Sequence, residues 1–287
     1  MKYLTLILAI TFFSCTQKQD TGRGSGLMED DPALIANTTL VVSSPFSARV
    51  RQGTITTAPI NTTVVIVPAP ATLPASVELN HPPIVSQGSQ GSCVACLFAG
   101  VRASENSYKT GVMTPLSTAF IYDQTKFNSD CGSGTGMLAV LVFLMRTGVC
   151  KESTLPYNSA VCSPSAITPA MTTEAANYKI TTYQQLLPSD IPALKTALNN
   201  RHAIGVAIRG DYNFLTCNYP NYIWKVQGTM PRSVNHACYV VGYDDSKHAF
   251  HVVNSWGTSW GDQGTFWIDY DLFAGGEVAG YCYTMTL

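Results

Sequence analysis

The stretch Gln87-Gly88-Ser89-Gln90-Gly91-Ser92-Cys93-Val94-Ala95-Cys96 decides how this chain folds and what chemistry it can support. Apolar residues recur at helical spacing from its end onward, so we predict a helix that begins at Cys93 and ends near Gly111. A thiol at a helix N-terminus is favoured as the thiolate, which is the nucleophilic form. Cys93 is therefore the candidate nucleophile.

Two distant segments, Asn235-His236-Ala237 and Val253-Asn254-Ser255-Trp256-Gly257, carry the groups that a thiol nucleophile needs. His236 lies 143 residues after Cys93 and Asn254 lies 161 residues after it, close to the roughly 130 to 150 residues expected when such groups meet across a cleft. His236 would serve as acid and base. Asn254 would accept the other ring N–H and fix the tautomer and orientation of the imidazole.

Acyl transfer also needs hydrogen-bond donors aimed at the oxyanion of the tetrahedral intermediate. Gln87, six residues before Cys93, can offer its side-chain NH2 beside the Cys93 backbone N–H. The glycines at 88 and 91 would let the backbone turn tightly there. Trp256 could cover the hydrogen bond between Asn254 and His236 and exclude water.

Together these residues resemble those of papain-like cysteine proteases, in their bacterial branch, over about Pro82 to Leu287. The resemblance implies that Cys93 is the nucleophile, His236 the acid/base, Asn254 its orienter and Gln87 the oxyanion donor. It implies an α+β fold of two lobes, with a helical N-terminal lobe, an antiparallel β-barrel-like C-terminal lobe and the active-site cleft between them. Further matching stretches are Leu116-Ser117 to Tyr122, Gly148 to Tyr157, Gly242-Tyr243, Trp260-Gly261 and Gly264.

The resemblance implies a cysteine endopeptidase that hydrolyses peptide bonds through a Cys93 thioester, acts on protein or peptide substrates as a monomer, and needs no metal or organic cofactor. In relatives a glycine stretch beside the cleft pairs with the substrate backbone like an added strand, which makes Gly134 and Thr135 candidate substrate-binding residues, with Asn235 and Trp256. Two alternatives remain open. One is a catalytically silent peptide-binding or adhesion protein on the same scaffold, and the other is an acyl-transfer, transpeptidase-like enzyme.

Two positions depart from the family pattern. Gln90 stands where relatives commonly carry a half-cystine, so one familiar bridge is absent and the usual partner of Cys131 is missing. Val94 replaces the aromatic residue that usually follows the nucleophile. Neither change touches a proton or a catalytic donor.

Composition excludes several other classes of function. The chain has 287 residues, a formal net charge of -1 and 12% charged residues, which leaves no basic patch for nucleic acid or anionic lipid. Cys93 and Cys96 form a C-x-x-C motif, but no second cysteine pair or close histidine pair follows at the spacing of a metal site. A redox-active cysteine pair of the thioredoxin type is expected next to a βαβ unit, and the sequence around Cys93 and Cys96 lacks that pattern.

The N-terminus predicts export. Met1-Lys2, an apolar run from Tyr3 to Phe13 and Ser14-Cys15 form a secretory signal, and the run is shorter than the ~20 residues of a membrane span. It resembles a bacterial lipoprotein signal, which implies that Cys15 is lipidated and that the lipid alone attaches the protein to a bacterial cell envelope. Without the lipid, the protein is expected to be secreted. We predict three regions: a signal peptide at 1–15, a Thr/Ser/Pro-rich tether or pro-segment at 16–75, and a catalytic domain at 76–287.

An exported chain with nine cysteines is expected to contain disulfides. Cys96 and Cys238 lie in apolar runs and are interpreted as small buried hydrophobic residues. The bridge candidates lie near predicted loops: Cys131, Cys150, Cys162, Cys217 and Cys282.

Periodicity predicts further helices and strands. Helices are expected at 136–146 and at 190–200, the second behind a Ser189 cap. Strands are expected at 203–208, 237–243, 249–253 and 265–270. The β-branched runs Thr39-Leu40-Val41-Val42 and Thr63-Val64-Val65-Ile66-Val67 give the N-terminal segment some strand character.

Overall fold

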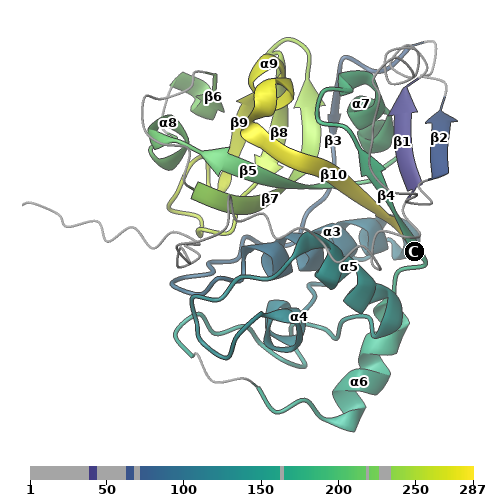
Figure 1. The fold of residues 1–287 in the computed structure, drawn as a ribbon, viewed down its shortest axis with the longest axis vertical. Helices are drawn as coiled ribbons and strands as arrows, with labels where there is room; N and C mark the ends of the chain where they lie inside the picture. The colour runs from purple at the N-terminus through teal and green to yellow at the C-terminus, as the bar shows by residue number, and fades with distance from the viewer. Residues whose placement is uncertain (1–38, 44–62, 68–71, 162–164, 218–219, 226–233) are drawn as a thin grey trace, which may run out of the picture.

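The computed structural model describes residues 39–43, 63–67, 72–161, 165–217, 220–225 and 234–287 (Figure 1). The predicted signal peptide at 1–15, with Cys15, lies outside the described residues, as does most of the segment 16–75. Two strands of that segment are described. They confirm the strand character that its β-branched runs predict.

Helices form one lobe of the molecule (Figure 1). The predicted first helix is confirmed: α3 begins at Cys93 and ends before Gly111, whose φ of 74° supplies the left-handed turn that closes a helix. The predicted helix at 136–146 is α5. The helices of this lobe are α3 (Cys93–Thr110), α4 (Thr118–Thr125), α5 (Met137–Arg146), α6 (Pro169–Ala175) and the short η1 (Ala176–Tyr178).

The other lobe is built on one mixed sheet, in the order β2-β1-β4-β10-β5-β7-β8-β9-β6, with β3 paired to β7. Its central pairs are antiparallel, whereas β1–β2, β1–β4 and β6–β9 are parallel. Among the described residues the path does not close on itself. The strands are β1 (Thr39–Ser43), β2 (Thr63–Val67), β3 (Ser76–Glu78), β4 (Thr182–Leu186), β5 (Ile204–Gly210), β6 (Ile223–Trp224), β7 (Val234–Asp244), β8 (Ala249–Val253), β9 (Thr265–Asp269) and β10 (Val278–Thr286).

Four of these strands, β5, β7, β8 and β9, coincide with the predicted ones to within a few residues, and β8 has the predicted bounds. The predicted cap of the third helix is wrong. Helix α7 spans Ile191–Asn199, and Asp190 caps it because its Oδ1 accepts a hydrogen bond from the Ala193 N–H at 3.1 Å. The remaining short helices are α8 (Tyr212–Leu215), η2 (Pro220–Tyr222), α9 (Tyr270–Leu272) and η3 (Phe273–Glu277).

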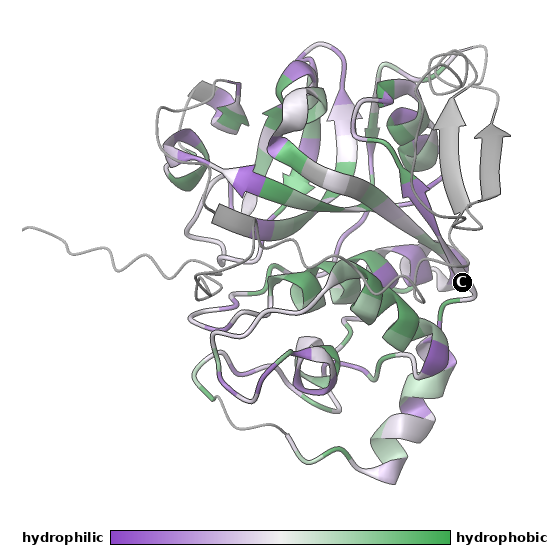
Figure 2. Cartoon of the chain, viewed as in Figure 1, coloured by the Kyte–Doolittle hydropathy of each residue, from purple (hydrophilic) through white to green (hydrophobic). Residues whose placement is uncertain are grey.

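Helix α3 packs directly on β7, and this contact joins the two lobes. A glycine makes the close approach possible: a Cβ added at Gly100 would lie 2.6 Å from Cζ of Tyr239. Leu97 and Phe98 likewise press on Gly205 of β5. Hydrophobic residues gather on α3, on α5 and in the strands that face them (Figure 2). Helix α3 is therefore packed closely against the sheet.

The cysteine prediction needs correction. Cys150, Cys217 and Cys282 are buried free thiols rather than half-cystines. Burial raises the pKa of Cys150 to about 11 and that of Cys217 to about 12, so these thiols stay protonated and inert. Cys131 is disulfide-bonded, and Cys162 lies outside the described residues. Cys96 and Cys238 are buried, as predicted.

Within the described ranges, no helix combines the length and the apolar character that a bilayer crossing requires.

Candidate active site

Cys93 is the first residue of α3 and is 5% exposed. The residue before it, Ser92, makes no side-chain capping bond to the helix. Its hydroxyl instead lies 2.7 Å from the hydroxyl of Tyr157, which donates to the carbonyl of Gln87 at 3.0 Å. Because Ser92 does not cap the first turn, the partial positive charge of the helix end is left uncompensated by its side chain next to Cys93.

The loop before Cys93 needs its glycines for two different reasons. Gly88 has a φ of 58°, in the left-handed region that disfavours other residues. Gly91 has no such φ, but a Cβ there would lie 2.7 Å from the carbonyl oxygens of Gly132 and Ser133. The loop thus turns at Gly88 and packs tightly against the 131–135 loop at Gly91.

His236 lies on β7 opposite Ile208 of β5, and Asn254 follows the end of β8. The two side chains are joined by a hydrogen bond of 2.7 Å between His236 Nε2 and Asn254 Oδ1. Asn254 Oδ1 can only accept, so Nε2 is the ring nitrogen that carries the proton. Nδ1 is then the nitrogen that would exchange a proton with a nucleophile. Both residues are 2% exposed.

Aromatic rings hold the imidazole in place. The ring of Trp256 stacks on His236 with centroids 4.7 Å apart and planes inclined by 30°. Phe214 of α8, fully buried, lies 6.1 Å from His236 and 5.2 Å from Trp256. Phe214 also contacts Trp224, Trp260 and Phe266. This aromatic cluster, Phe214 with Trp224, Trp256, Trp260 and Phe266, covers the His236 side of the site.

A chain of hydrogen bonds joins three of the four predicted catalytic residues through Ser255. The Ser255 hydroxyl donates to Gln87 Oε1 at 2.7 Å, and the Ser255 backbone N–H donates to Asn254 Oδ1 at 2.7 Å. Asn254 Oδ1 in turn accepts from His236. Gln87 comes from the helical side and the other residues from the sheet side, so the chain of bonds crosses between the lobes.

Helix α3 and strand β7 also contact each other next to these hydrogen bonds. Cys96, one helical turn beyond Cys93, and Cys238, two residues beyond His236, line one cavity of about 450 Å3 together with Asn254 and Ser255. Cys238 Sγ donates to Asn254 Oδ1 at 3.6 Å. The segments that carry the predicted thiol and the predicted base are therefore neighbours in the fold.

Three further residues form hydrogen bonds in the site, although sequence reasoning gave them no catalytic or binding role: Ser255, Tyr157 and Cys238. Ser255 stands inside the quoted motif Asn254-Ser255-Trp256, and Tyr157 ends a stretch that matches the family. The sequence motifs therefore contain Ser255 and Tyr157, but their hydrogen-bond partners lie on segments far away along the chain.

The predicted substrate-binding residues lie in different settings. A Cβ added at Gly134 would meet no atom within 4 Å, so the backbone there borders open space. Thr135 is buried and its hydroxyl donates to the carbonyl of Thr125 at 2.8 Å, which holds the loop in place. Asn235 lies on β7 opposite Arg209. Trp256 contacts His236, as described above.

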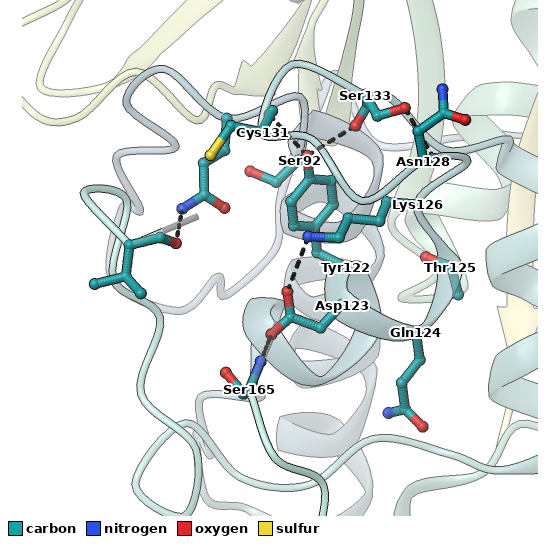
Figure 3. A network of polar contacts seen from close by, with 12 residues as sticks. Ser92, Tyr122, Asp123, Gln124, Thr125, Lys126, Asn128, Cys131, Ser133 and Ser165 are labelled. Atoms are coloured by element: carbon teal, nitrogen blue, oxygen red, sulfur yellow. Dashed lines mark hydrogen bonds and ion pairs between the residues drawn. The ribbon is translucent and has the colours of Figure 1, made fainter. Parts of the chain in front are cut away.

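The loop that carries Gly134 is supported from below by α4 (Figure 3). The hydroxyl of Tyr122 lies within hydrogen-bond distance of two of its carbonyls, 2.9 Å from Cys131 O and 2.8 Å from Ser133 O. The Ser133 hydroxyl accepts from the Asn128 N–H at 3.1 Å. These bonds fix the loop next to Gly91 and hence next to the N-terminus of α3.

The other histidines have partners of their own. His251 Nδ1 lies 2.8 Å from Glu78, and His81 Nδ1 lies 2.8 Å from the carbonyl of Pro82. In the described part of the chain, His248, Asp269 and Asp271 bring possible metal-ligand atoms within 4.8 Å of one another. The His248 and Asp271 side chains are more than half exposed, and His248 Nε2 lies 3.5 Å from Asp271 Oδ1.

A partly exposed ion pair ties α3 to the sheet lobe at a distance from the site. His202 Nδ1 lies 3.0 Å from Glu105 Oε1. The hydrogen bond to Glu105 raises the pKa of His202 above its usual value, because a neighbouring carboxylate favours the imidazolium. Burial raises the pKa of Glu105 and lowers that of the neighbouring Arg102 to about 10.

Comparison with known proteins places these features in a family. The family model described as "Papain family cysteine protease" matches residues 73–281. Cathepsin J of Mus musculus is 31% identical over 199 residues, which is 66% of this chain and 57% of that protein. Cathepsin K of Mus musculus is 31% identical over 186 residues, 63% of this chain and 54% of that protein. The chain thus spans about half the length of the curated relatives it matches.

Among solved structures, xylellain, a cysteine protease from Xylella fastidiosa, superposes with a TM-score of 0.65 at 26% identity. The match covers 75% of this chain and 87% of xylellain. The match of the family model covers well over half of the residues, and it includes the Cys93, His236 and Asn254 segments. The chain therefore belongs to the papain family of cysteine proteases.

Proposed function

We propose that this protein is a cysteine endopeptidase that hydrolyses peptide bonds through a thioester on Cys93. The observation that carries the proposal is the buried hydrogen bond of 2.7 Å between His236 Nε2 and Asn254 Oδ1. This bond leaves Nδ1 for the exchange of a proton, on a strand that packs against the helix beginning at Cys93. The comparisons support the same chemistry, since the relatives named above are cysteine proteases or cathepsins.

The steps of the reaction follow from these groups. The Cys93 thiolate attacks the peptide carbonyl, and the oxyanion accepts hydrogen bonds from the Cys93 N–H and the Gln87 side chain. The His236 imidazolium gives its proton to the leaving amine, and the thioester forms. His236 then takes a proton from water, which attacks the thioester and frees Cys93. Asn254 keeps the ring oriented throughout.

The test is incubation of the full protein with an epoxide inhibitor that alkylates active thiols, followed by mass mapping, and in parallel with a protein substrate. We expect labelling at Cys93 and cleavage of the substrate, both lost in His236→Ala. Cys96→Ala, which removes the other thiol of the C-x-x-C motif, should keep both. A folded protein with an inert Cys93 would contradict the proposal and favour the peptide-binding alternative.

Hydrolysis and acyl transfer share the thioester, so they need a separate measurement. Reaction in H2 18O with a peptide amine present distinguishes them. We expect 18O in the new carboxylate, at one atom per cleavage. Products that are joined to the amine and carry no 18O would show that the reaction is transfer rather than hydrolysis.

We propose also that the protein is exported and anchored by lipid on Cys15 in a bacterium. The N-terminal sequence supports this, and the bacterial cysteine protease xylellain is among its relatives. Mass analysis of the N-terminal peptide from the membrane fraction should find a lipid-modified cysteine, and Cys15→Ser should release the protein. An unmodified N-terminus after cleavage elsewhere would contradict lipidation.

The segment 16–75 is proposed to act as a tether rather than as an inhibitor. In support, β1 pairs with β4, and the sheet order puts β4, β10 and β5 between β1 and the β7 strand that carries His236. Strands β1 and β2 therefore stand at the edge of the sheet away from His236 (Figure 1). Deleting residues 16–38, ahead of β1, should leave the peptidase activity unchanged, whereas an increase of tenfold or more would support inhibition.

A further inference from the structure

A cavity of about 450 Å3 lies between the two lobes. Six segments, distant from one another in the sequence, contribute residues to its lining: 82–86, 96–100, 115–118, 152–159, 237–239 and 253–255. Cys93, His236 and Gln87 are not among the lining residues. The cavity is therefore a separate feature from these predicted catalytic groups, although Asn254 belongs to its lining.

The cavity extends from the protein surface toward the contact between α3 and β7. Three of its lining residues, Pro83, Pro115 and Asn158, are exposed, whereas Cys96 of α3 and Tyr239 of β7 are buried. Its volume falls within the roughly 300 to 1,000 Å3 of sites that hold small organic molecules. The cavity is thus large enough and open enough to admit such a molecule.

Most of the residues that line the cavity are apolar. Ile84, Leu97, Leu116 and Val253 bring apolar side chains to it from four different segments of the chain. An apolar group that is placed among them leaves water, and this favours its binding. A molecule suited to the cavity therefore has a hydrocarbon body.

The lining holds one carboxyl group, that of Glu152, and no lysine, arginine or histidine. Glu152 Oε1 accepts a hydrogen bond from the Tyr157 N–H at 2.6 Å, and the Thr118 N–H also bonds to this carboxylate. Both partners line the cavity as well, so the carboxylate is held at its wall. Burial raises the pKa of Glu152 above its usual value, because a charge is costly away from water.

No positive charge accompanies this carboxylate. In the part of the chain that the structure describes, the ion pairs of lysine and histidine go to other carboxylates, and Glu152 takes part in none of them. A cation brought next to Glu152 would offset its partly buried charge, whereas an anion would be repelled by it. The charge of the lining therefore selects for a positively charged ligand.

We propose that this cavity is a binding site for a small organic amine, whose ammonium group pairs with Glu152 and whose hydrocarbon body fills the apolar part. Cys238 and Asn254 belong to the lining, so a bound amine lies next to the residue that orients His236. The site does not depend on peptide cleavage. It can therefore be tested in a protein that lacks the nucleophile.

The experiment is a titration of the full protein carrying Cys93→Ala, followed through its methyl NMR signals. The probes are three molecules of nearly the same shape: phenylpropylamine, phenylpropanol and phenylpropanoate. We expect the amine to saturate with a Kd of about 1 mM or lower. The neutral alcohol should bind at least about tenfold more weakly, and the anion should not bind. Equal binding of all three, or no binding of the amine, would overturn the proposal.

A matched pair of variants tests the role of the carboxylate. Glu152→Gln removes the charge and keeps an oxygen that can accept from the Tyr157 N–H. It should weaken binding of the amine at least about tenfold and leave binding of the alcohol unchanged. Glu174→Gln removes a carboxylate that pairs with Lys151 at 3.2 Å outside the cavity, and it should leave both affinities unchanged. Equal losses in the two variants would contradict the pairing with Glu152.

The position of the bound amine gives a second measurement that needs no variant of the cavity. Nuclear Overhauser effects from its ring protons should reach the methyl groups of Leu97 and Leu116. They should not reach those of Val140 and Leu141 on α5, which are fully buried elsewhere. Effects to other methyl groups alone would overturn the site and leave the proposed function standing, whereas a wild type without peptidase activity would overturn the proposed function and leave the site standing.

Discussion

On one side of the site Cys93 takes its position from a single helix end, whereas on the other side His236 is held by strand register, a hydrogen-bonded asparagine and stacked rings. The helix end supplies an electrostatic field that favours a thiolate. The sheet side supplies direction, because the hydrogen bond to Asn254 fixes the orientation of the imidazole. The proposed nucleophile therefore depends on charge, and the proposed base depends on packing.

The largest effect should come from removing the nucleophile. Cys93→Ala should lower kcat/KM by at least about 10⁴-fold, because no thioester can form, and the assay is cleavage of a fluorogenic peptide. Thermal unfolding should change little, since one helix end positions the residue. Activity above a tenth of wild type would mean that another thiol does the chemistry.

A pair of core variants sharpens the contrast between the sides. Phe214→Ala removes the centre of the aromatic cluster next to His236, and Phe120→Ala removes a fully buried ring of α4 in the helical lobe. Each should lower the free energy of unfolding by about 3–5 kcal/mol, measured by urea titration. Only Phe214→Ala should also lower kcat/KM more than tenfold in the folded protein. An equal loss of activity in both variants would remove the distinction between the sides.

The loop on the Cys93 side depends on Gln90, in place of the half-cystine of relatives. Gln90 Nε2 donates to the carbonyls of Asn158 and Val161, at 2.9 and 2.8 Å. Gln90→Ala should lower the free energy of unfolding by about 1–2 kcal/mol, because two long-range hydrogen bonds are lost. Gln124→Ala, which removes a local hydrogen bond made by an exposed residue of α4, is the control and should cost under about 0.5 kcal/mol. Equal costs would show that Gln90 does not hold the loop.

The smallest effect concerns the Glu105–His202 pair, which ties α3 to the sheet lobe. The pKa of His202 in the folded protein lies above its usual value, so its contribution to stability is full below about pH 6.5 and is lost as the pH rises through the folded pKa. The raised pKa of Glu105 acts with the same sign. Glu105→Gln should therefore lower the free energy of unfolding more at pH 6 than at pH 9, and an NMR titration should show a lower His202 pKa. An equal loss at both pH values would contradict this.

Sequence reasoning succeeded where a local signal determines structure. Gly111 ends α3, Gly136 precedes α5, and the alternation of Ala249 to Val253 matches β8. It did not predict β4 or β10, because their pairing joins segments about a hundred residues apart and β4 carries the polar Gln184 and Gln185.

For the site, the residue types and their spacing predicted the groups, and the structure adds the bonds between them. The hydrogen bond between Ser255 and Gln87 depends on contact between loops 168 residues apart, which no local pattern reveals. Three of the disulfide candidates failed for a similar reason: an oxidising compartment favours bridges, but Cys150, Cys217 and Cys282 are separately enclosed in the core.

The central claim is that His236 keeps Cys93 ready as a thiolate, and the rate of alkylation of Cys93 by iodoacetamide between pH 6 and 8 tests it most directly. A thiol with the ordinary pKa of about 8.5 slows by roughly two orders of magnitude over this range as it is protonated. The account predicts that wild-type Cys93 slows less than about threefold, and that His236→Ala restores the steep dependence. A steep dependence in wild type that His236→Ala leaves unchanged would contradict it.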